Sequence, residues 1–198
     1  MKHVMIPDTQ IFPGSKTEHI IAAGKYIKKH KPDKIIIIGD WWDMPSLSSY
    51  DTAGDKGWED KDVKSDLEVG LTTMTKFLKT LRSFKYSPEI HFAVGNHEDR
   101  ISRAESSAEH RRMSGFVNLE EQILEPLRKL DVKTYNFLDI FVLDGICYSH
   151  YFVNPTSLFP NPIGGTIESK LKNLGHSFTM GHQQHKQAGE IFTCTGER

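Results

Sequence analysis

Short apolar runs alternate with longer stretches of helical periodicity through the first half of the chain. Residues 34–38 hold a block of isoleucines without polar alternation, which is typical of a parallel strand covered on both faces. Similar apolar runs predict strands at residues 2–6 and 89–94. Apolar residues at helical spacing predict helices from residue 16 or 17 to about 30, and over 63–84. This alternation indicates an α/β fold built on a parallel sheet.

The second half of the chain predicts shorter elements and contains no repeats. The predicted helices begin near residue 99 and cover residues 119–130 and 166–172. The predicted strands cover residues 133–136, 140–143, 146–149, 177–180 and 190–195. Asp144-Gly145 predicts a tight hairpin turn between two of these strands, and the polar stretch 45–60 predicts a long loop. We therefore expect residues 1–198 to form one domain.

Composition and charge exclude several classes of protein. The chain has 25 Lys and Arg residues against 26 Asp and Glu, so it has no global basic field of the kind that binds nucleic acid nonspecifically. This balance does not exclude a local basic groove. Cys147 and Cys194 form no Cys-x-x-Cys pair, so neither a thiolate zinc site nor a disulfide framework is expected. No apolar run approaches the ~18 residues of a membrane span, and the first strand follows Met1 too closely for a signal peptide. We expect a cytoplasmic protein with no membrane partner, and the sequence leaves its oligomeric state open.

Polar residues follow four of the predicted strands directly. The four segments are Asp8-Thr9-Gln10, Gly39-Asp40-Trp41-Trp42-Asp43, Gly95-Asn96-His97-Glu98 and Gly181-His182-Gln183-Gln184-His185. Taken singly, such segments are ordinary turns or caps, and an isolated histidine such as His150 is usually a hydrogen-bonded core residue. Together they lie at the carboxyl ends of strands, where α/β proteins build their sites. Their oxygen and imidazole side chains predict one metal site assembled from scattered loops.

The same segments, in the same order, resemble the calcineurin-like metallophosphoesterases. The resemblance runs from Asp8 to Gln184, and it is closest to the small phosphoesterases of phages and prophages, especially over residues 43–50. It implies a four-layer αββα sandwich with mixed sheets. Since that fold generally continues beyond its last motif, the second sheet is expected to be incomplete at the C-terminus. A phage-encoded protein would act in the host cytoplasm.

The resemblance also implies a binuclear metal centre. Two divalent ions about 4 Å apart would give a metal-bound hydroxide at neutral pH and neutralise the phosphoryl oxygens. Asp40 would bridge the ions, because a carboxylate can share its oxygens between them, and Asp8 would hold the first ion. The ligands of the second ion would be Asn96, His150 and His182.

Two positions depart from the family pattern, and both belong to the first ion. Gln10 and Gln184 stand where the family usually has histidines. An amide oxygen in place of imidazole predicts a weaker first site that favours Mn²⁺ first and Mg²⁺ next, with Zn²⁺, Fe and Ni²⁺ as further candidates. His185 is the alternative ligand to Gln184 if the loop carries a bulge.

The expected activity is hydrolysis of phosphate esters. By resemblance, His97 would protonate the leaving oxygen while Asp43 orients its ring. Arg100, Trp42 and Tyr50 are the candidates for contact with the substrate. We expect a phosphodiesterase that acts on DNA, RNA or a nucleotide. The alternatives are a phosphomonoesterase, and a catalytically weak regulatory or binding protein with a degenerate first metal site.

Overall fold

Two stacked β-sheets form the centre of the molecule. A computed structural model describes residues 1–48, 62–106, 117–154 and 157–192. The first sheet is parallel throughout, and its strand order is β1 (His3–Ile6), β2 (Lys34–Ile37), β3 (Glu89–Ala93) and β4 (Lys133–Tyr135). The second sheet is mixed, and its strand order is β5 (Phe141–Leu143), β6 (Ile146–Ser149) and β7 (Phe178–Met180). The fold is therefore mixed α/β, with a parallel sheet and a second, mixed sheet.

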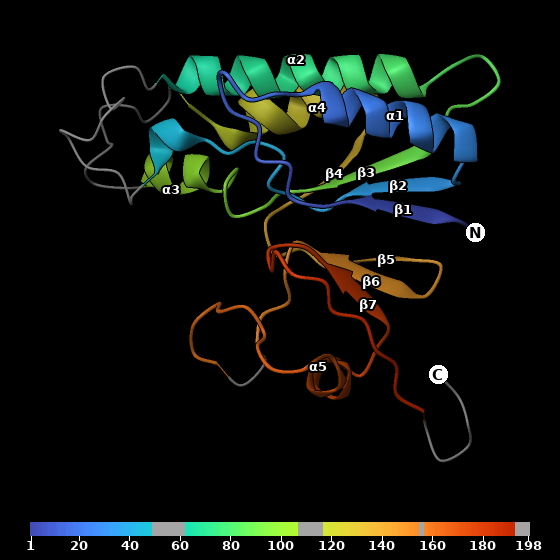
Figure 1. The fold of residues 1–198 in the computed structure, drawn as a ribbon. Helices are drawn as coiled ribbons and strands as arrows, with labels where there is room; N and C mark the ends of the chain where they lie inside the picture. The colour runs from blue at the N-terminus through green and yellow to red at the C-terminus, as the bar shows by residue number, and fades with distance from the viewer. Residues whose placement is uncertain (49–61, 107–116, 155–156, 193–198) are drawn as a thin grey trace.

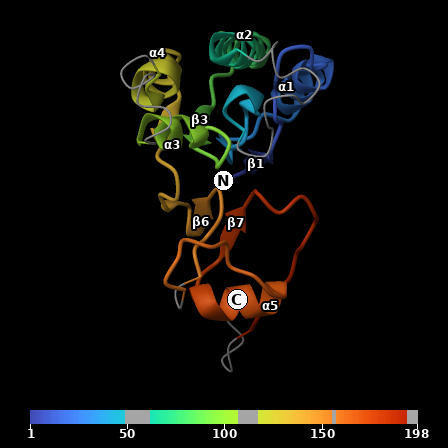
Figure 2. The ribbon, with the colours of Figure 1, turned by 90° about the vertical axis from the view of Figure 1, so that its left-hand side faces the viewer.

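Helices cover the outer face of each sheet (Figures 1 and 2). The face of the first sheet turned away from the second carries α1 (Glu18–His30), α2 (Val63–Leu81) and α4 (Glu125–Lys129). The far side of the second sheet carries α5 (Ile167–Leu174). Among the helices of the described residues, none has the length and apolar character needed to cross a membrane.

The isoleucine block of β2 is buried on both faces, as its sequence predicted. Ile35 and Ile37 pack among the helices, while Ile36 and Ile38 pack between the two sheets, and all four are 0% exposed. The alternation of side chains along a strand sends successive residues to opposite faces. Between the sheets, these isoleucines contact a smaller cluster that includes Phe141. The two layers are thus joined by apolar packing directly beneath the carboxyl ends of the strands.

Most elements lie where the sequence predicted them, and the differences have local causes. The helix α2 ends at Leu81 instead of residue 84, because the backbone turns extended at Arg82 and residues 83–86 form a tight turn. Two short helices, Arg100–Ser106 (α3) and Pro45–Leu47 (a 3₁₀ turn, η1), flank the site, and a π-helical segment (Glu120–Leu124, η2) precedes α4. The predicted strand at 190–195 is wrong for residues 190–192, which are irregular, and its remainder lies outside the described residues, as does most of the 45–60 loop. Cys147 lies half-buried in β6, and Cys194 falls outside the described residues.

Candidate metal centre

The carboxyl ends of strands from both sheets converge on one cluster of polar side chains. Asp40 follows β2 and His150 follows β6, while His182 follows β7. One ligand atom from each of these three residues lies within 4.8 Å of the others, so the group could hold a metal ion. Asn96, after β3, joins them, since its Oδ1 lies 2.9 Å from His150 Nε2 and 2.8 Å from His182 Nδ1. Asp8, after β1, borders the same cluster through its Oδ1, which accepts a hydrogen bond from the His182 backbone N–H at 3.2 Å.

The hydrogen bonds of His150 fit a metal ligand. Its Nδ1 donates to the Ile38 carbonyl at 2.8 Å, which leaves the lone pair of the neutral ring on Nε2. This Nε2 faces Asn96 Oδ1 and lies 3.4 Å from Asp40 Oδ2. An unprotonated Nε2 would face two other electron-pair donors, Asn96 Oδ1 and Asp40 Oδ2, an arrangement that either a proton or a metal ion between them stabilises. Two imidazoles, an amide oxygen and a carboxylate suit a divalent transition metal.

The pKa shifts of these groups indicate that a proton would compete with a metal ion for the cluster. Burial disfavours charge on His150, but the hydrogen bond and charge of Asp40 outweigh it and raise the pKa of His150. Burial also disfavours charge on Asp40, yet His150 and His97 hold its pKa below the ordinary value. The pKa of His182 is lowered by burial and by the neighbouring His150. A proton on His150 therefore occupies the position that suits a metal, so metal binding would release a proton.

The residues predicted for a first ion are less closely gathered. Gln10 lies beside the cluster, since its backbone N–H donates to the Asp40 carbonyl at 2.8 Å and its Nε2 lies 3.5 Å from His97 Nε2. Burial raises the pKa of Asp8, against the lowering effect of the His150 charge. Gln184 and His185 are both exposed and line one pocket with Asp8 and Gln10.

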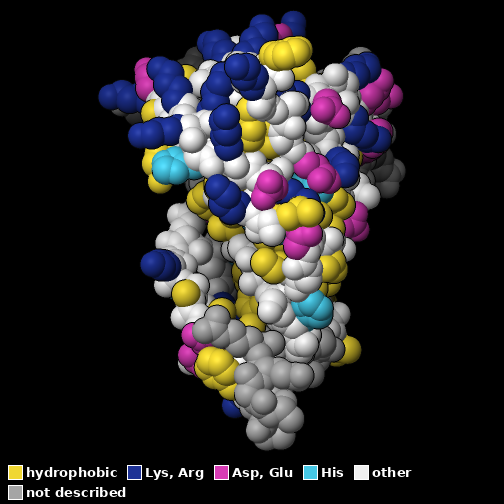
Figure 3. Space-filling view, turned by 90° about the vertical axis from the view of Figure 1, so that its right-hand side faces the viewer, with side chains coloured by type: hydrophobic (Ala, Val, Ile, Leu, Met, Phe, Trp, Pro, Cys, Tyr) yellow, Lys and Arg dark blue, Asp and Glu magenta, His cyan; other side chains and the backbone are white. Residues whose placement is uncertain are grey.

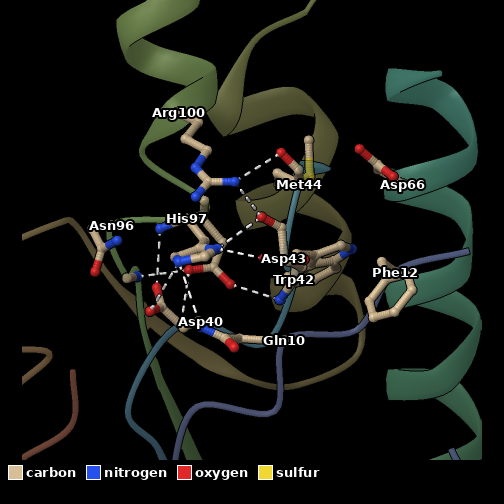
Figure 4. Close-up of polar contacts among 12 residues, drawn as sticks. Gln10, Phe12, Asp40, Trp42, Asp43, Met44, Asp66, Asn96, His97 and Arg100 are labelled. Atoms are coloured by element: carbon tan, nitrogen blue, oxygen red, sulfur yellow. Dashed lines mark hydrogen bonds and ion pairs between the residues drawn. The ribbon is translucent and has the colours of Figure 1, made fainter. Parts of the chain in front are cut away.

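His97 is held over the cluster by the loop that follows β2 (Figure 4). Its Nδ1 lies 2.8 Å from both Oδ1 and the carbonyl oxygen of Asp43, and both are acceptors, so Nδ1 carries a proton. Its Nε2 points towards Asp40, 3.8 Å from Oδ2. Burial opposes a charge on this ring, but the Asp43 bond and the Asp40 charge raise the pKa of His97. The ring is thus oriented so that Nε2 is the atom able to deliver a proton.

The structure contradicts one predicted substrate contact and reassigns part of another. Trp42 is 0% exposed, because its indole packs on Phe92 and fills the space beside Gly70 of α2, where a Cβ would lie 1.8 Å from its Nε1. Its side chain is therefore not accessible to a substrate in this structure. Arg100 donates through Nη1 to the carbonyls of Asp43 and Met44 at 2.9 and 3.1 Å, so it fixes the loop that holds His97 (Figure 4). Tyr50 lies outside the described residues.

Glu98 has a part in the site that sequence reasoning missed. Its side chain is fully buried and accepts hydrogen bonds from the backbone N–H groups of Gly95, Asp40 and Trp42 at 2.8–3.0 Å. Burial, with the Asp40 charge adding to it, raises the pKa of Glu98 to about 7. The only signal in the sequence was an acidic residue directly after the motif histidine. This carboxyl group ties the turn after β3 to the turn after β2.

Four of the eight non-glycine residues with positive φ in the described part of the chain lie where these turns meet. Gln10, Asp40, Met44 and His182 all have φ between 47° and 62°, a region that costs non-glycine residues about 1–3 kcal/mol. Gly95 allows the close approach, since a Cβ there would lie 2.2 Å from Asp40 Oδ1. Strain of this kind persists where surrounding contacts over-determine the backbone, and it is common at functional sites.

A scan against protein-family models and a search of curated proteins each found no match for this sequence. The class of the molecule therefore follows from its fold and its site alone. It is a mixed α/β protein whose Asp40, His150 and His182 could hold a metal ion.

Proposed function

We propose that the protein is a metal-dependent phosphodiesterase with the αββα sandwich of the calcineurin-like metallophosphoesterases. One observation supports this above the others: the ligand cluster of Asp40, His150 and His182 lies beside a histidine, His97, whose Nδ1 is fixed by Asp43. A metal cluster alone would suit many proteins. A protonated ring beside the cluster suits a reaction in which an oxygen leaves phosphorus as an alcohol or a phenol.

The residues divide into ligands for two divalent ions, Mn²⁺ first among the candidates. Asn96, His150 and His182 would hold one ion, and Asp40 would be shared with the other. The remaining ligands would be Asp8, Gln10 and Gln184. When bound, the ions supply a nucleophile at neutral pH and neutralise charge on the phosphoryl oxygens.

The protein's own part in the reaction is delivery of a proton. As an oxygen of water bonds to phosphorus, the bond from phosphorus to the leaving oxygen breaks. The leaving oxygen takes the proton of His97 Nε2, and the proton of the water passes to solvent. Asp43 keeps Nδ1 protonated, so the proton is lost from Nε2, the atom that faces Asp40. The Asp43 bond and the Asp40 charge raise the pKa of His97, which favours the protonated ring that a general acid requires.

Two observations bear on the alternatives. Arg100, a candidate substrate contact, uses Nη1 to bind backbone carbonyls, so this group is not presented to the extra charge of a monoester, and the singly charged diester is favoured. The replacement of two imidazoles by Gln10 and Gln184 favours a weaker first site, and thereby a catalytically weak regulatory or binding protein as the second candidate.

Purified protein tests these candidates directly. We expect it to hydrolyse bis-p-nitrophenyl phosphate with Mn²⁺ faster than p-nitrophenyl phosphate, and to lose the activity in EDTA. Asp40→Asn should abolish hydrolysis and reduce bound Mn²⁺, whereas Glu68→Gln, an exposed change on α2, should do neither. Bound Mn²⁺ without hydrolysis of either ester or of single-stranded DNA would favour the binding protein. Activity that survives in Asp40→Asn would overturn the proposal.

A further inference from the structure

A pocket of about 790 Å³ lies along the open edges of the two sheets. Met5 of β1 and Phe178 of β7 lie on its walls, together with α5 and residues 183–189. The hollow can be seen on the left of Figure 3, where the segment after β7 stands away from the body of the molecule. Its volume falls in the range of about 300–1,000 Å³ that small-molecule sites occupy.

The pocket reaches the metal centre at one end. Asp8 and Gln10 line it, and Asp8 in turn accepts the backbone N–H of His182. A substrate with its phosphorus at the cluster would therefore extend one ester group along the pocket. A small monoester would leave most of this volume empty.

One wall of the pocket is apolar. Ile167 and Leu171 of α5 face it, as do Phe178 and Met180 of β7. Apolar side chains such as these can pack against the face of a planar ring. The ester group that fits is thus large and has an apolar face.

The pocket lining also carries positive charge, beside the apolar side chains of α5. Lys170 is 2% exposed, and its Nζ donates to the amide oxygens of Gln183 at 2.5 Å and Gln187 at 2.7 Å. Both partners are neutral, so these contacts solvate the ammonium group without cancelling its charge. Lys186 also lines the pocket and is exposed. A wholly apolar ester would gain nothing from these ammonium groups, whereas a group that also carries oxygen acceptors could accept hydrogen bonds from them.

We infer that the pocket binds the nucleoside portion of a nucleotide-sized phosphodiester, with a planar base against Phe178 and the oxygen acceptors of base and sugar towards Lys170 and Lys186. The inference rests on the proposed phosphodiesterase activity, and it identifies the substrate class of that same site. Gln187, whose amide oxygen accepts from Lys170, lines the pocket and brings an amide NH₂ group suited to base and sugar oxygens.

Two chromogenic esters separate this pocket from the metal centre. The probes are p-nitrophenyl phosphate, which is too small to fill the pocket, and the p-nitrophenyl ester of thymidine 5′-monophosphate, which is large enough. Ala188→Trp would place an indole in the pocket, and it should lower kcat/KM at least 10-fold more for the thymidine ester than for p-nitrophenyl phosphate. Lys172→Trp, an exposed change on α5 outside the pocket lining, is the matched control and should change neither. Lys186→Gln should raise KM for the thymidine ester about 5-fold, and Lys172→Gln should not.

The outcomes distinguish the two proposals. Equal effects of Ala188→Trp on both esters, or no effect on either, would overturn the pocket assignment and leave the phosphodiesterase activity standing. If the protein hydrolyses neither ester, the activity fails, and calorimetric titration with thymidine 5′-monophosphate decides the pocket alone. Binding by wild type that is lost in Ala188→Trp would support the pocket, and absence of binding by wild type would overturn it.

Discussion

The buried carboxylate of Glu98 accepts a hydrogen bond from the backbone N–H of Asp40 at 3.0 Å. Its other bonds, to the backbone of Gly95 and Trp42, complete a bridge between two strand ends that lie far apart in the sequence. The position of Asp40, a candidate metal ligand, therefore depends on the side chain of Glu98, whose hydrogen bonds here are all to backbone N–H groups.

Replacement of this acid tests the bridge. Glu98→Gln presents an NH₂ group to backbone N–H donors, so at least one buried donor loses its acceptor. The expected loss in the free energy of unfolding is about 1–3 kcal/mol, measured by urea denaturation at pH 5 in EDTA. Glu121→Gln, an exposed change in the η2 segment, should stay within about 0.5 kcal/mol. Equal stability of the two variants would show that the bridge is energetically unimportant.

The raised pKa of Glu98 also predicts how stability depends on pH. The folded protein holds this proton up to a pKa of about 7, well above the ordinary value of 4.5. The raised pKa of Glu98 therefore adds to the free energy of unfolding by roughly 3 kcal/mol below pH 4.5, and this addition is lost as the pH rises through 7. Glutamine has no proton to lose. The difference in the free energy of unfolding between wild type and Glu98→Gln should therefore narrow between pH 5 and 8. A gap that widens over this range would contradict the assignment.

Gly95 gives a second test of the ligand geometry. Gly95→Ala would place a Cβ 2.2 Å from Asp40 Oδ1, which must then move. We expect the variant to bind Mn²⁺ at least 10-fold more weakly by equilibrium dialysis. Gly164→Ala, where a Cβ would meet nothing within 4 Å, is the matched control and should bind as wild type does. Unchanged affinity in Gly95→Ala would remove Asp40 from the ligand set.

His97 should affect the reaction without affecting the metal. His97→Ala should lower kcat by about 10²–10⁴, the usual range for a positioned acid or base. The decrease should be smaller for p-nitrophenyl esters than for alkyl esters, because p-nitrophenolate leaves without help from a proton. Metal content by mass spectrometry is the accompanying measurement. Loss of metal in this variant would instead make His97 a ligand.

The two glutamines predict unequal affinities for two ions. If Gln10 and Gln184 complete the first site, purified protein should retain one ion and need added Mn²⁺ or Mg²⁺ for full activity. The double change Gln10→His with Gln184→His should tighten the weaker ion and shift its preference towards Zn²⁺. His185→Ala should have little effect. Two equally tight ions in the wild type, or loss of one ion in His185→Ala, would overturn the assignment.

The parts of the molecule that follow from local pattern could be predicted from the sequence. The block of isoleucines at residues 35–38 predicted a strand buried on both faces. Polar residues at strand ends predicted the cluster that includes Asp40 and His150. What could not be predicted depends on partners from other elements. The burial of Trp42 depends on the absence of a side chain at Gly70, and the bonds of Glu98 depend on backbone that no periodicity describes.

The cluster draws its members from both layers: Asp40 and Asn96 follow strands of the parallel sheet, and His150 and His182 follow strands of the mixed sheet. An ion held there would link the two sheets and would stabilise their association in addition to their apolar packing. Its binding energy would then appear as resistance to unfolding, about 2.7 kcal/mol at a free concentration one hundred times Kd. The melting temperature of the protein would report the metal concentration around it, even with no substrate present.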